Sequence, residues 1–387
     1  MLTLAIALAL CCLAQAAAWA WLGIGLRRER EDVPPETAEG GGLPISVVVA
    51  AHDEADRIGA LLDALAAQTH GAFEVIVVDD RSTDATAGIV RQRAETFPVP
   101  LRLVSIAPGD APASVHFLSD LWRGEDDLPL PPKKNALTHG IRAATHDRLA
   151  FTDADCEPPP GWLAALARYA HASPDAVLVG YGPLEGRGWL GRFCRYETAL
   201  TATLSAGAVG HGQAWHGVGR NLSYPRLLWD RLGRFDAHAD SLSGDDDLFV
   251  QQAQREGVPI RYVLDAEAFV PSPAPSGWRA FWRQKRRHAS AGAHYRRDVL
   301  TALGAFQVTG LALWIGAPLL QAIWGVPWGW GFLGARLLLQ RAVLADAWDA
   351  LGARPDLRLW HPVLDAMYAG YQLVAMALGA LPTPRRW

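Results

Sequence analysis

The chain has 387 residues, half of them hydrophobic and 20% charged, with a formal net charge of −4. This slightly acidic balance gives no reason to expect nucleic acid as a partner, and the four cysteines indicate neither a disulfide framework nor a zinc site. The length suits one large domain with additional elements, and the mixture of apolar and charged residues favours a soluble domain joined to membrane segments.

The first 26 residues form an apolar run that contains no charged side chain. At least about 20 apolar residues are needed to cross a bilayer, so the run is long enough for a transmembrane anchor. The alternative is a cleaved secretory signal, but such a signal has a basic start and an apolar core of about 7–15 residues. Arg27, Arg28 and Arg30 follow the run. Because basic residues prefer the cytoplasmic side, we expect an uncleaved anchor in the plasma (inner) membrane and a downstream domain in the cytoplasm.

After a linker over residues 27–43, rich in Pro, Glu and Gly, the pattern of residues 44–290 predicts an α/β domain. Short β-branched runs alternate with apolar residues at helical spacing, which is typical of βαβ units and a mostly parallel sheet. A further helix is expected after Asp84, with Thr83 or Asp84 as its N-cap. The expected strands are Ile45–Val49, Phe73–Val78, Leu101–Ser105 and Arg148–Thr152, and the other expected helices are Ala55–Gln68 and Asn135–Ala144.

Polar clusters follow three of these strands: His52–Glu54, Asp79–Asp80 and Asp153–Asp155. In parallel sheets, ligands bind beyond the carboxyl ends of the strands, so we expect the three clusters to share one rim. Asp79 and Asp80 are suited to accept hydrogen bonds from a base or a ribose, although acids here also stabilise a following helix. The segment Ala107–Pro132, rich in Pro, Asp and Gly, is expected to be a functional flap.

Asp153 and Asp155 are the candidate metal ligands. They stand two apart after a strand, where both carboxylates can turn toward one hard cation, Mg or Mn. Such a cation neutralises the charge of a departing diphosphate. Lys133 and Lys134 precede the expected helix Asn135–Ala144, whose N-terminus can face a phosphate, or they form a solvated lysine pair.

Gly244 is followed by three acids, of which Asp246 is the expected general base and Asp245 the second choice. A hydroxyl that acts as a nucleophile must lose its proton as it attacks, and a positioned carboxylate can take that proton. A charged helix start is the alternative reading of these acids. Gln284 and Arg287 share a helical face in a basic segment and could orient an acceptor or a phosphate, or the segment could simply meet anionic lipid.

The C-terminal region, residues 299–387, is expected to hold two to three membrane helices behind a basic juxtamembrane segment at 291–298. No charge occurs from Val299 to Ala335, and tryptophans mark the ends of the apolar runs. A buried helical subdomain is the alternative.

Together these motifs resemble those of the family 2 glycosyltransferases with the GT-A fold, a Rossmann-like nucleotide-diphospho-sugar transferase fold. The resemblance runs from about Leu43 to Ser290. It includes a strand and turn in which Ala50, His52 and Asp53 replace the family's Pro, Tyr and Asn. The further matching segments are Val78–Asp84, where Arg81 replaces a Gly, Lys133–Leu137, Phe151–Cys156, Gly219–Tyr224, Gly244–Asp246, and Gln284–His288, where His288 replaces a Trp.

The resemblance implies inversion at the sugar carbon by direct attack, with a UDP- or GDP-sugar as donor. It implies donor contacts by Ala51, His52, Glu54, Asp79, Asp80, Lys133 and Asp153, a metal on Asp153 and Asp155, and an acceptor or phosphate side at Asn221, Gln284 and Arg287. The short chain and its C-terminal helices look like ceramide-glucosyltransferase-like enzymes and favour a single transfer to a lipid, with a glycan acceptor also open. A processive polysaccharide synthase and a non-catalytic membrane scaffold are the alternatives.

Overall fold

The computed structural model describes residues 1–35, 42–107 and 130–379, which fall into two compact units. The helical unit comprises Met1–Asp32, Glu185–Gln213 and the described part of Ala274–Pro382. The α/β unit comprises Val33–Leu184 and Ala214–Pro273. Each unit is described by itself below.

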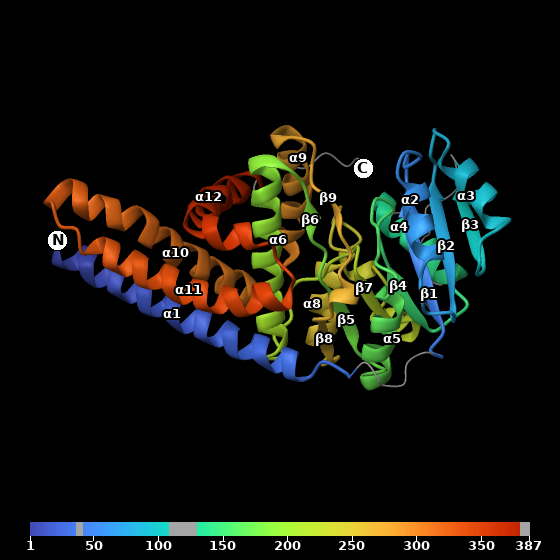
Figure 1. The fold of residues 1–387 in the computed structure, drawn as a ribbon, viewed down its shortest axis with the longest axis horizontal. Coiled ribbons are helices and arrows are strands. Elements are labelled where there is room, and N and C mark those ends of the chain that lie inside the picture. Colours follow the sequence, from blue (N-terminus) through green and yellow to red (C-terminus); the bar gives the residue numbers. More distant parts are fainter. Residues whose placement is uncertain (36–41, 108–129, 380–387) are drawn as a thin grey trace, which may run out of the picture. The chain divides into compact units, whose positions relative to one another are not determined.

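A seven-stranded, mostly parallel sheet forms the α/β unit, with strand order β3-β2-β1-β4-β7-β5-β8 (Figure 1). Only β7, among the described strands of this sheet, runs antiparallel to its neighbours β4 and β5. The strands are β1 (Ile45–Ala51), β2 (Phe73–Asp80), β3 (Leu101–Ile106), β4 (Arg148–Phe151), β5 (Val177–Gly180), β7 (Leu222–Pro225) and β8 (Ile260–Val263). The helices are α2 (Ile58–Ala66), α3 (Thr86–Ala94), α4 (Pro132–Ala143), α5 (Trp162–Ala172), α7 (Arg226–Arg231) and α8 (Asp247–Arg255), with 3₁₀ turns at Asp236–His238 and Ala266–Ala268.

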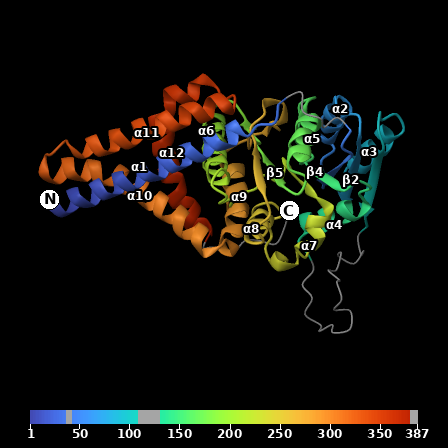
Figure 2. The ribbon, with the colours of Figure 1, turned by 90° about the horizontal axis from the view of Figure 1, so that it is seen from below.

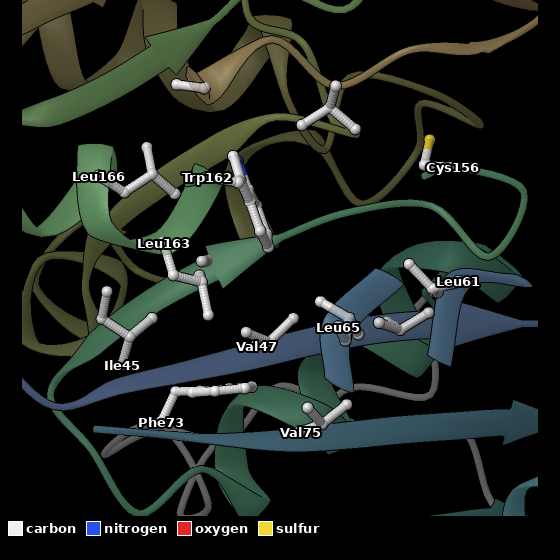
Figure 3. Close-up of a cluster of buried hydrophobic side chains, with 14 of the residues drawn as sticks. Ile45, Val47, Leu61, Leu65, Phe73, Val75, Cys156, Trp162, Leu163 and Leu166 are labelled. Carbon is white, nitrogen blue, oxygen red and sulfur yellow. The ribbon is translucent and has the colours of Figure 1, made fainter. Parts of the chain in front are cut away.

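Every residue of β2 and β4 is buried, which is why Val75–Val78 and Leu149–Phe151 are apolar throughout and do not alternate with polar residues. One face of the sheet packs on α2 and α5 through a core that includes Leu65, Val75 and Trp162 (Figure 3). Trp162 is completely buried, and its indole nitrogen donates to the side-chain oxygen of Asn221 at 3.0 Å. The core therefore reaches from the first strands to the segment before β7.

The expected α/β class with a mostly parallel sheet is confirmed, and the element boundaries differ by a few residues. The strand β2 continues through Asp79 and Asp80, so these acids end the strand instead of following it. The expected N-cap at Thr83 or Asp84 is wrong, since α3 begins after Ala85. The Asp84 carboxylate still accepts the backbone N–H of Thr86 at 2.9 Å, because the chain makes a compact turn before the helix.

The helical unit contains α1 (Leu2–Glu31), α6 (Gly188–Val209), α9 (Trp278–Ala289), α10 (Arg297–Trp324), α11 (Gly329–Ala350) and α12 (Pro355–Gly379). A 3₁₀ turn spans Ser290–His294, and a separate two-stranded sheet consists of β6 (Leu184–Glu185) and β9 (Ser272–Pro273). The helices α6 and α9 fall within residues 44–290, which the sequence predicted as one domain, yet they cluster with the terminal helices. The expected flap, Ala107–Pro132, lies mostly outside the described residues.

Glycines set the crossing of α1 and α6. A Cβ added at Gly25 would lie 1.9 Å from the carbonyl oxygen of Gly207, so only glycine permits this approach. Small residues at such crossings are typical of membrane helices.

Within the described residues, α1 and α10 are long and apolar enough to cross a membrane. The other two C-terminal helices, α11 and α12, carry charged residues that pair inside the unit, among them Arg336 with Asp365.

Candidate active site

Three parallel strands bring the expected site residues to one edge of the sheet. The register pairs Ala51 of β1 with Asp79 of β2, and Val48 of β1 with Phe151 of β4. Because the strands point the same way, their carboxyl ends meet at one rim (Figure 1).

His52 and Asp80 form one corner of this rim. A ring nitrogen of His52 lies 2.7 Å from the carbonyl oxygen of Asp80. The Asp80 carboxylate is completely buried and accepts two hydrogen bonds from Arg81, at 2.7 and 3.0 Å. Arg81 has a φ of 60°, a left-handed conformation that explains why the resembling family has Gly here. The two hydrogen bonds between the Arg81 guanidinium and the Asp80 carboxylate offset the backbone strain. They also place a positive charge at the rim that the sequence motif did not predict.

Asp79, the neighbouring acid, accepts the backbone N–H of Ser82 at 3.4 Å and is almost fully buried. Asp53 has a φ of 53°, and its carboxylate accepts the backbone N–H of Thr83 at 2.7 Å. These bonds join the turns after β1 and β2 into one structure. The donor contacts predicted for Ala51, His52, Asp79 and Asp80 stay predictions.

Ligand atoms of Asp153, Asp155 and Cys156 all lie within 4.8 Å of one another. Burial raises the pKa of the Cys156 thiol, which donates to an Asp155 oxygen at 3.7 Å. Burial, and then the neighbouring Asp153, raise the pKa of the Asp155 carboxyl. Two crowded carboxylates without a soft donor fit a hard divalent cation, whose charge relieves their repulsion.

Glu54 and Arg57 flank this acid pair. Burial and the charge of Asp155 raise the pKa of the Glu54 carboxyl. The Arg57 guanidinium lies 3.4 Å from an Asp155 oxygen and 4.0 Å from a Glu54 oxygen. The predicted site residue Glu54 therefore lies within the electrostatic field of the acid pair. Arg57 was missed by the sequence analysis, although its place three residues after Glu54, at the start of α2, was a usable signal.

Lys133 connects the acid pair to the acids that precede α8. Its ammonium lies 3.1 Å from an Asp153 oxygen and 3.2 Å from an Asp245 oxygen. Burial alone would lower the pKa of Lys133, but the carboxylates of Asp153, Asp245 and Asp246 outweigh it and raise the pKa. Lys133 is therefore a fixed positive charge in the site, and not one of two solvated lysines.

Asp246, the expected general base, lies beside this lysine. One carboxylate oxygen accepts the backbone N–H of Asp247 at 2.8 Å, and the other accepts that of Gly219 at 2.9 Å. A Cβ added at Gly219 would lie 3.1 Å from Asp246, 3.2 Å from the Lys133 ammonium and 3.5 Å from Asp245. These three charged groups therefore meet around the Gly219 backbone.

The pKa of the Asp246 carboxyl lies well above the ordinary value of an aspartate. Burial first, then the charges of Asp247 and Asp245, raise the pKa of Asp246 to about 7, against the opposing effect of Lys133. Asp246 is also the N-cap of α8. The sequence analysis gave a charged helix start as the alternative reading of these acids, and Asp246 has this capping position while it also lies beside Lys133.

Lys134 holds the segment that leads to these acids. It is fully buried and donates to the carbonyl oxygens of His238 and Ser241 at 2.7 and 2.8 Å. Burial lowers the pKa of Lys134 to about 8. The sequence analysis missed this positioning role, because a Lys–Lys pair carries no signal that distinguishes its buried member.

Asn221 is buried among backbone groups instead of facing an open surface. Its amide nitrogen donates to the carbonyl oxygens of Tyr181 and Ala268 at 2.9 and 2.6 Å, and its oxygen accepts from Trp162. All of this bonding lies within the α/β unit. Asn221 thus supports the fold behind Gly219, and its predicted contact with the acceptor stays a prediction.

We expect Asn221→Ala to lower the free energy of unfolding by about 3 kcal/mol, because it leaves buried polar groups unpaired. The measurement is the thermal unfolding midpoint of the purified full chain. Asn135→Ala, at another buried asparagine, is the matched control for loss of volume and amide. An unchanged midpoint combined with weakened acceptor binding would show that Asn221 is an acceptor contact after all.

Gln284 and Arg287, the remaining predicted residues, lie on α9 in the helical unit. Gln284 is half-buried and Arg287 is exposed. Between them, Lys285 pairs with Glu197 of α6 at 2.7 Å. Their acceptor-side role stays a prediction.

A mostly parallel sheet whose rim carries an acid pair after β4 defines the GT-A class of glycosyltransferase folds. The profile of Glycosyl transferase family 2 matches residues 46–106, and that of Glycosyl transferase family group 2 matches residues 150–378. The second match covers more than half of the chain, and the chain belongs to this glycosyltransferase family.

Curated relatives include the probable glycosyltransferase YdaM of Bacillus subtilis, 25% identical over 254 residues, which cover 63% of this chain and 54% of YdaM. The uncharacterized glycosyltransferase alr2836 of Nostoc is 26% identical over 29% of this chain and 28% of its own length. The aligned region thus spans about half or less of these relatives. Among solved structures, the Pyrobaculum calidifontis mannosyltransferase PcManGT, in complex with GDP-Man and Mn²⁺, matches 92% of this chain and 99% of its own, with a TM-score of 0.52 and 22% identity. That likeness supports the fold.

Proposed function

We propose that the chain transfers a sugar from a nucleoside-diphosphate sugar to an acceptor hydroxyl with inversion at the sugar carbon. The observation that carries this proposal is the position of Lys133, between Asp153 of the acid pair and Asp245 beside Asp246. A cation at the acid pair, together with Lys133, would stabilise the negative charge of the departing diphosphate. Asp246, whose pKa is raised, would take the proton of the attacking hydroxyl. Membership of a glycosyltransferase family supports it.

Asp153 and Asp155 would hold a divalent cation, Mg²⁺ or Mn²⁺, which neutralises charge on the diphosphate leaving group. PcManGT was solved with Mn²⁺ and GDP-Man, so GDP-sugars are tested first, together with the UDP-sugars that the family resemblance implies. Lys133 stabilises the same negative charge from the side of Asp245. We expect the nucleoside to lie against the rim of the sheet. This part of the rim consists of the turn His52–Glu54 and the end of β2, Asp79 and Asp80.

Asp246 is proposed to take the proton from the acceptor hydroxyl as the hydroxyl attacks the sugar carbon. Gly219 and Asp247 donate backbone hydrogen bonds to its two oxygens and so fix its orientation. The raised pKa gives the carboxylate enough basicity to accept a proton near neutral pH.

We propose that the chain is an integral protein of the inner membrane and that the acceptor is a lipid carrying a hydroxyl. The apolar helices α1 and α10 support a membrane location, and the arginines after residue 26 support a cytoplasmic catalytic domain. The basic face of α9 is suited to anionic headgroups.

The experiment that tests the activity is a screen of UDP- and GDP-sugars for metal-dependent release of nucleoside diphosphate by the purified full chain. Lipid extract is then added to show whether it accelerates release and acquires the sugar. Release from one donor class, lost with a chelator and regained with Mn²⁺ or Mg²⁺, is the expected result. No release with any donor, together with no nucleotide binding, would favour a non-catalytic scaffold.

The topology is tested by a reporter fused after Arg30 in a bacterial host. We expect a cytoplasmic readout, because Arg27, Arg28 and Arg30 resist translocation. In a matched variant that replaces these three arginines by glutamine, the cytoplasmic preference should weaken. A periplasmic readout from the native sequence would contradict the proposed orientation.

A further inference from the structure

A second basic side chain, Arg57, lies beside the acid pair that follows β4. Its guanidinium is 3.4 Å from an oxygen of Asp155 and 4.0 Å from an oxygen of Glu54. Both closest approaches involve the same nitrogen, Nη1, and both exceed the length of about 2.7–2.9 Å that is usual for a charge-assisted hydrogen bond. More than half of the side chain is exposed. The acids therefore hold the guanidinium loosely, and its other donor groups can face a ligand at the rim.

The backbone at Arg57 is well fixed, although its side chain is not. The N–H of Arg57 donates to the carbonyl oxygen of Glu54 at 2.9 Å, and Arg57 is the N-cap residue of α2. The N–H of Glu54 in turn donates to the hydroxyl of Thr86 at 2.8 Å. The turn before α2 thus keeps the guanidinium at the rim and leaves its direction adjustable.

Arg57 and Lys133 reach the acid pair from opposite faces of the sheet. Side chains alternate between the two faces along a strand. Val47 of β1 belongs to the core that α2 covers, whereas Val48 faces α4, 2.4 Å from a Cβ added at Gly140. Figure 2 shows α2 and α4 on the two sides of the sheet. Because Arg57 stands at the start of α2 and Lys133 in the first turn of α4, a ligand at the acid pair would have one basic side chain on each side.

A diphosphate at the acid pair needs positive charge from side chains as well as from a cation. The carboxylates of Asp153 and Asp155 would cancel the charge of a divalent cation bound between them. Adjacent ligand positions around such a cation are about 3 Å apart, since each metal–oxygen distance is about 2.1 Å. A guanidinium that contacts an oxygen of Asp155 is therefore also close to the position of a phosphate oxygen on the same cation.

Another arginine, Arg220, acts on Asp155 as well, but it is bound to the backbone. Burial and the charge of Asp153 raise the pKa of the Asp155 carboxyl, and Arg57 opposes them more strongly than Arg220 does. The Arg220 guanidinium donates to the carbonyl oxygen of Gly182. Of these two arginines, Arg57 is the one whose guanidinium can turn to a ligand without giving up a backbone hydrogen bond.

We propose that Arg57 binds the diphosphate of the donor from the side of Asp155, opposite Lys133. The two basic side chains then stabilise the leaving group from both faces of the sheet. The inference rests on the proposed function and deepens it, because it assigns diphosphate binding to a residue that lies outside the motifs of the family resemblance.

The test measures the binding of Mn²⁺ and of nucleotides to the purified full chain, without turnover. GDP and UDP are titrated at saturating Mn²⁺, and Mn²⁺ alone is titrated by electron paramagnetic resonance. We expect Arg57→Gln to weaken binding of the nucleotide that the native chain prefers about 20-fold, since a hydrogen-bonded charge is lost. Mn²⁺ alone should bind this variant about twofold more tightly, because a positive charge beside Asp155 has been removed.

Two further variants define the role of the guanidinium. Arg57→Lys keeps the charge without the planar fork and should reduce the loss of nucleotide affinity to about fivefold. Arg93→Gln is the matched control, because Arg93 at the end of α3 pairs with Asp63 of α2 and both side chains are partly exposed. This control should leave both affinities unchanged.

Equal nucleotide affinity in Arg57→Gln and Arg93→Gln would overturn the inference. A loss of Mn²⁺ affinity in Arg57→Gln as large as the loss of nucleotide affinity would also overturn it, since Arg57 would then support the acid pair instead of the diphosphate. A native chain that binds neither Mn²⁺ nor nucleotide would overturn the proposed function together with this inference, so the two failures are distinguishable.

Discussion

Replacing Asp246 by asparagine is expected to lower kcat for sugar transfer by about 10³-fold while nucleotide affinity changes by less than about threefold. A positioned general base contributes about 10²–10⁴-fold to such a reaction. Asparagine has nearly the same shape and can still accept the N–H of Asp247 through its oxygen, but its NH₂ cannot accept the N–H of Gly219, and the amide cannot take a proton. The measurement combines single-turnover transfer with nucleoside diphosphate titration.

The pH profile of kcat/KM tests the same residue independently. Only the deprotonated carboxylate accepts a proton, and burial with neighbouring acids raises the pKa of Asp246 to about 7. The rate should therefore rise as pH increases toward about 7 and level off above it. In Asp246→Asn this acid limb should disappear, because the titrating group has been removed.

Asp175→Asn is the matched control, since this exposed aspartate lies in the α/β unit away from the rim. It should leave both rate and pH profile unchanged. Loss of nucleotide affinity in Asp246→Asn, with residual transfer still following the same acid limb, would reassign Asp246 to donor binding.

Asp155→Ala is expected to weaken Mn²⁺ binding at least 100-fold and to reduce metal-dependent donor turnover by about 10³-fold. The acid pair offers two carboxylates, and a hard cation that keeps only one of them loses a charged ligand where it must also hold a diphosphate. Binding is measured by electron paramagnetic resonance of free Mn²⁺, which requires no activity. Turnover is measured as nucleoside diphosphate release.

Two further variants serve as controls for Asp155→Ala. Cys156→Ala should leave Mn²⁺ affinity within about threefold, because burial raises the pKa of the thiol and keeps it protonated. Asp175→Ala controls for the loss of one surface carboxylate. If Cys156→Ala weakened binding as strongly as Asp155→Ala, the site would be one with a thiolate ligand, and the proposed hard-cation site would be wrong.

The sheet could be predicted because central strands such as β2 are buried on both faces, which leaves a β-branched run over Val75–Val78. The site's rim followed from the rule that ligands lie at the carboxyl ends of parallel strands. The side-chain partners could not be predicted in the same way. The contact of Lys133 with both Asp153 and Asp245 depends on the packing of α4 against a distant loop, and no local pattern encodes it.

The helical unit was harder to anticipate for a related reason. The helix α6 contains apolar residues together with Arg195 and Glu197, so it did not look like a membrane-type element. Its place beside α1 depends on the close approach at Gly25 and Gly207, a property of shape rather than hydropathy. The pairing of Arg336 with Asp365 likewise became visible only when α11 and α12 were packed together.

The most direct test is a cryo-electron microscopy structure of the full chain with Mn²⁺ and a nucleoside diphosphate. We predict a cation bound by Asp153 and Asp155 at about 2.1 Å and contacting the diphosphate, with Lys133 alongside and the Asp246 carboxylate facing the same space. A cation and diphosphate bound elsewhere, or Asp246 turned to a separate surface, would contradict a single site for departure and attack.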